Sequence, residues 1–126
     1  LQYLDISYNQ LEDLTGLSSL IHLRELKVDS NHLWSLDGIQ HLDGLLKLSA
    51  CHNRIKELSF TNSNLHRLEE LLLGNNEIEE IEEISSLQNL MVLQLDNNKL
   101  TNLKASQPMI HLRILRISNN AIHQLE

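Results

Sequence analysis

The seven histidines and the single cysteine are the residues of this sequence with the side chains best suited to metal binding or nucleophilic catalysis. A tetrahedral metal site needs three or four such ligands close together. Cys51 and His52 are adjacent, but no second cysteine or pair of carboxylates completes a ligand set. Neighbouring residues of an extended strand also point to different sides, so the imidazole would not reach the thiol. We therefore expect no metal, no cofactor and no catalytic residue, and the chain is predicted not to be an enzyme.

Six asparagines stand out by their spacing, with intervals of 22, 22, 23, 22 and 22 residues. Apolar residues occupy the positions five and three before each asparagine, and two and five after it. A fixed period in this range is typical of stacked supersecondary units. An asparagine amide both donates and accepts hydrogen bonds, and it can satisfy backbone groups that a buried turn leaves unpaired. The pattern predicts a structural ladder formed by Asn9, Asn31, Asn53, Asn76, Asn98 and Asn120.

The elements that position this ladder are predicted from one repeat, residues 23–45. Leu26 and Val28 alternate, as the inward side chains of a short strand do. Asn31 then turns the chain. Beyond it the apolar residues recur every three positions, which favours a 3₁₀-helix or a related tight coil over an α-helix. The members of this second series are Leu33, Leu36, Ile39, Leu42 and Leu45.

The frame L-x-x-L-x-L-x-x-N-x-L-x-x-L resembles the leucine-rich repeat family. Its 22-residue length is similar to the subclass found in intracellular phosphatase regulators and in axonemal, centrosomal and splicing scaffolds. The resemblance implies an α/β solenoid with short parallel strands on the concave face and 3₁₀ or irregular turns on the convex face. It covers residues 1–126 with about six repeats. Because neither end shows a cap, we expect the chain to be a fragment of a longer array.

The net charge of −7 arises from 17 acidic and 10 basic residues, and one window holds the excess. Residues 69–83 contain seven glutamates and no basic residue, so the remaining ten acids balance the ten bases. The window is interpreted either as a solvated face or as a docking patch for a basic partner. Because phosphate backbones would be repelled here, nucleic acid is not an expected ligand.

Side chains between the inward leucines should face the concave surface. Leu72, Val92 and Ile114 are apolar there although the core does not require it, so they are either a partner site or scattered surface residues. Trp34 lies on the flank, as a contact residue or packed against its neighbours. The two N-terminal tyrosines are interface anchors or cover an uncapped end. The predicted protein-binding residues are Tyr3, Tyr8, Trp34, Leu72, Glu79, Glu80, Val92, Ile114 and Arg116.

The cellular setting is predicted from several absences. One cysteine allows no intrachain disulfide, and the sequence has no Asn-x-Ser/Thr acceptor. No apolar run is long enough to span a bilayer. These features favour a cytoplasmic protein that does not bind membranes, and the family resemblance favours a cytoskeletal, centrosomal or ciliary location.

We expect a non-catalytic protein–protein interaction scaffold that binds a partner through the concave sheet and the flanking turns. Leu72, Val92 and Ile114 are expected to lie beside the acidic window, with Glu79 and Glu80 on its flank. The expected partner therefore carries a basic and apolar docking segment. Two alternatives remain open. The chain is either the recognition or targeting arm of a larger multidomain enzyme, or a structural element of a cytoskeletal or ciliary assembly.

Overall fold

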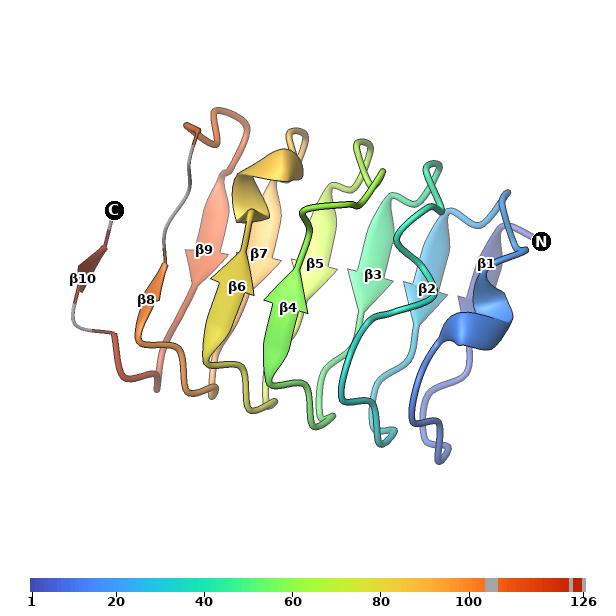
Figure 1. Ribbon diagram of the computed structural model, residues 1–126, viewed down its shortest axis with the longest axis horizontal. Helices are drawn as coiled ribbons and strands as arrows, with labels where there is room; N and C mark the ends of the chain where they lie inside the picture. The colour runs from blue at the N-terminus through green and yellow to red at the C-terminus, as the bar shows by residue number, and fades with distance from the viewer. Residues whose placement is uncertain (104–106, 123, 126) are drawn as a thin grey trace.

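The main element of the structure, a computed structural model, is a six-stranded parallel sheet that runs along the whole stack (Figure 1). The model describes residues 1–103, 107–122 and 124–125. Each strand is three residues long and pairs with the strand of the next repeat. In spatial order they are β1 (Tyr3–Asp5), β2 (Glu25–Lys27), β3 (Lys47–Ser49), β5 (Glu70–Leu72), β7 (Val92–Gln94) and β9 (Ile114–Arg116).

The register of this sheet places equivalent residues of successive repeats side by side. Leu26 of β2 lies beside Leu48 of β3, which in turn lies beside Leu71 of β5. The strands alternate between an inward leucine and outward side chains, as a period of two requires. The predicted parallel-strand solenoid is therefore confirmed. The outward surface of this sheet is called the sheet face below.

The return legs contain the predicted 3₁₀-helices and, in addition, short strands that the sequence did not predict. The helices are η1 (Thr15–Leu17) and η2 (Ile84–Ser86). The extra strands form two parallel pairs, β4 (Glu57–Ser59) with β6 (Glu80–Glu82), and β8 (Asn102–Leu103) with β10 (Gln124–Leu125). Leu58 and Phe60 are buried while Glu57 and Ser59 are exposed, so this leg follows an alternating pattern in place of the expected period of three.

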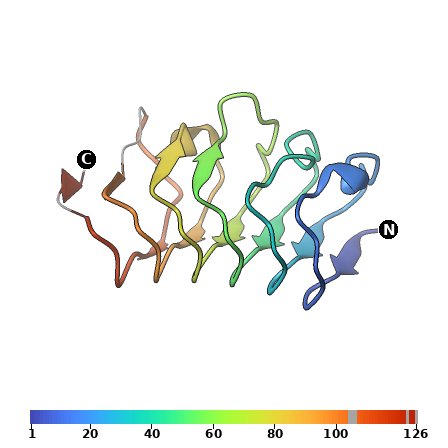
Figure 2. The ribbon, with the colours of Figure 1, turned by 60° about the horizontal axis from the view of Figure 1, so that its bottom comes forward.

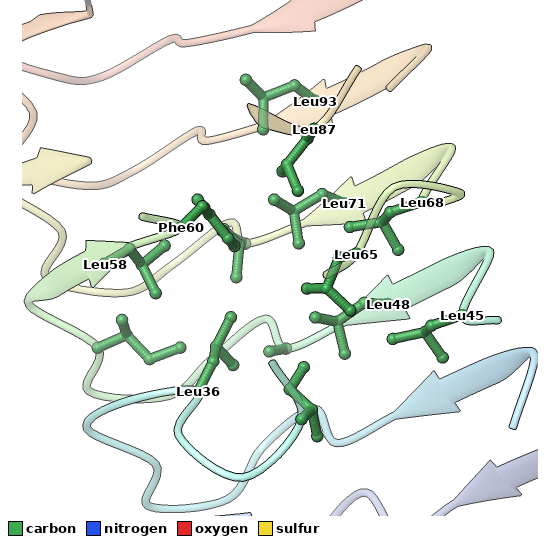
Figure 3. Close-up of a cluster of buried hydrophobic side chains, with 14 of the residues drawn as sticks. Leu36, Leu45, Leu48, Leu58, Phe60, Leu65, Leu68, Leu71, Leu87 and Leu93 are labelled. Atoms are coloured by element: carbon green, nitrogen blue, oxygen red, sulfur yellow. The ribbon is translucent and has the colours of Figure 1, made fainter. Parts of the chain in front are cut away.

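Leucine layers fill the space between the sheet and the return legs (Figure 3). Leu48, Leu71 and Leu93 from neighbouring strands are buried, and Phe60 fills the corresponding layer of the third repeat. Each unit covers only its neighbours, as expected for a solenoid. Leu115 of the last large-sheet strand therefore remains 39% exposed although it occupies an inward position of the repeat frame.

Figure 2 shows the turns that follow the strands of the large sheet, along the edge at the bottom of Figure 1. These turns contain the repeating asparagines and make up what is called the turn edge below. In the part of the chain that the structure describes, no helix has the length and apolar character needed to cross a membrane.

Candidate protein-binding surface

The asparagines of the turn edge link consecutive repeats through their side-chain amides. Asn76 Nδ2 donates to the carbonyl oxygens of Ala50 and Leu73, at 3.0 Å each. Asn76 Oδ1 accepts a hydrogen bond of 3.1 Å from the Ile55 amide. One side chain thus satisfies backbone groups of its own repeat and of the preceding one. Such groups would be costly to leave unpaired in the interior.

The same arrangement recurs along the stack. Asn53 Oδ1 accepts from the amides of Asn31 and Leu33, at 3.1 and 3.0 Å, and Asn98 Oδ1 accepts from the Ile78 amide at 3.0 Å. Among the described residues, no buried side-chain nitrogen or oxygen lacks a hydrogen-bond partner. The spacing of the turns is therefore fixed by hydrogen bonds, and this spacing holds the strands of the sheet face in place.

The residue before each asparagine adopts a left-handed backbone conformation, with φ between 54° and 61°. Asparagine tolerates this region better than most residues, because its short polar side chain bonds locally. The last three repeats use asparagine at this position, whereas the first three do not. The residues are Tyr8, Ser30, His52, Asn75, Asn97 and Asn119.

The N-terminal half of the sheet face carries charges that compensate each other. Glu25, Lys47 and Glu70 lie side by side in register on β2, β3 and β5. Lys47 Nζ lies 3.3 Å from Glu70 Oε2, and this hydrogen bond, together with the charges of Glu70 and Glu25, raises the pKa of Lys47. A partner would have to displace these existing pairs to use their charges.

The C-terminal half of the sheet face is apolar at its centre. Val92 and Ile114 are paired in register, and Leu72 lies beside Gln94 on the neighbouring strand. These residues line one shallow hollow together with Arg116. Leu72, Val92 and Ile114, called the apolar patch below, are thus brought together as the sequence analysis expected. Ile114 is 44% exposed.

The acidic window does not border the apolar patch as a single block. Only Glu70 lies directly beside Val92. Glu80 belongs to β6 and pairs with Glu57 in a separate sheet, and Glu79 lies 3.9 Å from Lys56. The expectation that Glu79 and Glu80 flank the apolar patch is therefore wrong. The turn at Asn76 reverses the chain, so residues close in sequence end on opposite sides of the stack.

Cys51 lies near the middle of the sheet face and is half-buried. Asp29 Oδ1 accepts hydrogen bonds from Ser49 Oγ at 2.6 Å and from the Cys51 amide at 2.8 Å. Burial raises the pKa of the Cys51 thiol, and the Asp29 carboxylate adds to this effect. This network was not predicted from the sequence, although Asp29 and Cys51 occupy equivalent positions of adjacent repeats. A raised thiol pKa is unfavourable for a nucleophile.

The three predicted aromatic contacts lie at different places. Tyr3 is on the sheet face in β1, Tyr8 is at the first turn, and Trp34 is on the turn edge of the second repeat. All three are exposed, with Trp34 at 67% and Tyr8 at 83%. None of them belongs to the apolar patch. Within the described ranges, no group of three His, Cys, Asp or Glu side chains is placed to hold a metal ion.

Comparisons with known proteins agree with this architecture. The family model described as Leucine Rich repeats (2 copies) matches residues 1–41 and 43–87. A septation initiation network scaffold protein of Schizosaccharomyces pombe is 99% identical over 42 residues, which are 33% of this chain and 4% of that protein. A protein phosphatase 1 regulatory inhibitor subunit homologue of Arabidopsis thaliana is 36% identical over 78 residues, 61% of this chain and 24% of that protein.

The fold also matches a solved structure. An internalin of Listeria monocytogenes superimposes with a TM-score of 0.84 at 26% identity, covering 97% of this chain and 36% of the internalin chain. The matched regions thus span well under two thirds of each of these proteins. The similarity concerns a segment of larger molecules.

Proposed function

We propose that this chain, which belongs to the leucine-rich repeat family, is a non-catalytic scaffold whose sheet face binds a partner protein. The observation that carries the proposal is the apolar patch. Its three side chains point away from the core, yet they lie together on adjacent strands. Clustered exposed apolar side chains often mark partner sites. The similarity to a septation network scaffold supports this type of role.

Preorganisation supplies the binding mechanism. The asparagine hydrogen bonds fix the strands before a partner arrives, so the chain loses little conformational entropy on association. The patch contributes apolar contact area, and neighbouring polar groups orient the partner. In typical interfaces, too, a few central residues supply most of the affinity.

The proposed partner segment has an apolar anchor beside a lysine or arginine. The anchor occupies the apolar patch, and the basic group approaches Glu70, the first residue of β5, and Glu69, which precedes it. Glu70 is already paired with Lys47, whereas Glu69 has no ion pair among the described residues. Arg116 lies on the opposite side of the patch from these glutamates and favours an acidic or carbonyl group there.

An intracellular setting is part of the proposal. The chain has one cysteine and lacks an Asn-x-Ser/Thr acceptor, as proteins of a reducing compartment commonly do. The names of the two curated relatives, a septation network scaffold and a phosphatase regulatory subunit, are compatible with that setting.

A second candidate function is a recruiting arm for an enzyme that lies elsewhere in the same chain or complex. The similarity to a phosphatase regulatory inhibitor subunit favours it. In that case the partner of the sheet face is the enzyme or its substrate. A sequence of the parent protein that includes a catalytic domain would support this candidate.

Site-specific photo-crosslinking tests the proposed function. A photoreactive amino acid replaces Gln94, at the apolar patch, in the parent protein expressed in its own cells. A matched control carries it at Gln88, exposed on the return leg. We expect a discrete protein adduct from position 94 that disappears with Val92→Asp and is absent from position 88. Equal adducts at both positions, or adducts that persist in Val92→Asp, would contradict the proposal.

A further inference from the structure

A second surface differs from the apolar patch in both its place and its charge. The turn edge of repeats two and three carries His32, Trp34, His52, Arg54 and Lys56, all of them exposed. These five residues are called the cationic edge. The turns they belong to, residues 30–34 and 52–56, contain no acidic residue, although the chain as a whole has a net charge of −7.

Trp34 is the feature of this edge that the fold does not explain. The indole is 67% exposed and belongs to the second of the six repeats. The residue at the equivalent position is Glu12 in the first repeat and Lys56 in the third, so the repeat frame requires no aromatic group there. An exposed tryptophan offers a large rigid contact area at little entropic cost, which is why it is enriched at interfaces.

His52 adds an independent observation. Its φ of 58° lies in the left-handed region, where the last three repeats place asparagine. Histidine, like asparagine, is one of the residues enriched in this region, so the backbone accommodates it. The imidazole is exposed and adds a second ring to the edge.

The charges of the cationic edge are largely available to a ligand. Arg54 has no ion pair among the described residues, and Lys56 Nζ lies 3.9 Å from Glu79 Oε2, with both side chains more than half exposed. An ion pair of this kind contributes little. A guanidinium, by contrast, presents donors in a fork that matches a carboxylate.

The size of the edge limits its ligand. Glu12 borders it on one side, and Glu77 and Glu79 border it on the other. With neighbouring strands about 4.8 Å apart, two repeats span roughly 10 Å, which an extended peptide covers with about three residues. A long polyanion would run on to the flanking glutamates and be repelled. From these observations we infer that the cationic edge docks a short acidic segment of a partner protein, with one or two carboxylates beside an apolar side chain that contacts Trp34.

This inference goes beyond the proposed function, because it assigns a second binding surface with the opposite charge preference. The apolar patch is expected to select a basic and apolar segment, whereas the cationic edge selects an acidic and apolar one. The cationic edge lies on the turns of repeats two and three, whereas the apolar patch lies on strands β5, β7 and β9. An experiment can therefore contradict the proposal for one surface and leave the proposal for the other intact.

Selection from a random peptide library displayed on phage, with the 126-residue chain as bait, tests the inference. We expect one enriched class to contain two or more Asp or Glu residues next to a leucine or an aromatic residue. A tryptophan-free peptide of this class is then titrated into the chain, with Trp34 as the reporter because it is the only tryptophan. The fluorescence should change saturably, and added salt should weaken binding.

The variants make the test specific. Arg54→Glu should weaken this peptide about tenfold or more, the size of an interface hot spot. Lys99→Glu is the matched control, because it makes the same charge reversal at the equivalent position two repeats away and should change affinity less than about twofold. Circular dichroism melts confirm that both variants fold.

Several outcomes would overturn the inference. One is the absence of acidic peptides among the selected clones, and another is equal binding by Arg54→Glu and the original chain. A third is a single-stranded oligonucleotide that binds more tightly than the peptide with the same dependence on Arg54. A fourth outcome is a selection that yields only basic peptides, whose binding is abolished by Val92→Asp. This result would support the apolar patch but leave the cationic edge without a ligand, and it would therefore overturn the inference.

Discussion

The asparagine turns and the sheet face are built by the same six segments, but they differ in what they repeat. The turns carry the same side chain in every unit, and its hydrogen bonds join backbone groups of adjacent repeats. The sheet face changes from paired charges at Lys47 and Glu70 to the apolar side chains of Val92 and Ile114. The repeated part fixes the structure, and the part that varies is free to determine what is bound.

Loss of one asparagine of the ladder is expected to have the largest effect, a decrease in the free energy of unfolding. Asn76→Ala removes the acceptor of the buried Ile55 amide and one of the two asparagine donors to each of the Ala50 and Leu73 carbonyls. We expect the free energy of unfolding to fall by about 1–3 kcal/mol, the cost of unsatisfied buried polar groups. Urea melts measure it. Glu79→Ala is the control and should change stability by less than about 0.5 kcal/mol, and equal midpoints for the two variants would contradict the ladder.

The complementary prediction concerns the sheet face. Val92→Asp places a carboxylate in the apolar patch beside Glu70. We expect affinity for the sheet-face partner to fall about tenfold or more, chiefly through faster dissociation, because central apolar contacts determine how long a complex lasts. Surface plasmon resonance with the crosslinked partner measures both rates. Stability should change by less than about 1 kcal/mol, and unchanged dissociation would place the contact elsewhere.

The repeated and the variable parts of the molecule also differ in how well the sequence predicts them. The spacing of Leu26, Val28 and Asn31 was enough to predict the parallel solenoid, because a repeat constrains every unit in the same way. Its strands then placed Leu72, Val92 and Ile114 on one surface, which the structure shows. The position of Glu80 was not predictable in this way. It depends on how tightly the turn reverses the chain, and the alternating burial of Leu58 and Phe60 made the outer leg a strand.

A smaller effect is expected at His52, which lies where the sheet face meets the asparagine turn of the third repeat. His52→Asn introduces the residue that the last three repeats carry at this left-handed position. We expect stability to change by less than about 0.5 kcal/mol, because both residues are enriched in this region. Binding of the acidic peptide should weaken in the same variant. Thermal melts and Trp34 fluorescence measure the two effects, and a loss of stability would show that the imidazole serves the fold.

The smallest predicted effect is a chemical one at Cys51. Burial, with a further contribution from the Asp29 carboxylate, raises the pKa of the thiol. The thiolate is the form that reacts, so iodoacetamide should alkylate Cys51 more slowly in the folded chain than in urea, with the rate increasing only at higher pH. Because the folded pKa is the higher one, the associated stability is present below the unfolded pKa and decreases as pH rises through the folded value. Equal rate profiles for folded and unfolded chains would exclude the shift.

Methyl NMR tests the central claim, that the sheet face binds its partner protein through the apolar patch. A chain labelled at the methyl groups of Leu, Val and Ile is titrated with the partner identified by crosslinking. We predict shifts at Leu72, Val92 and Ile114, with the buried Leu71 and Leu93 little affected. Ile21 and Ile110, exposed away from the large sheet, serve as internal controls. Shifts confined to Ile21 or Ile110, with the apolar patch unchanged, would contradict the account.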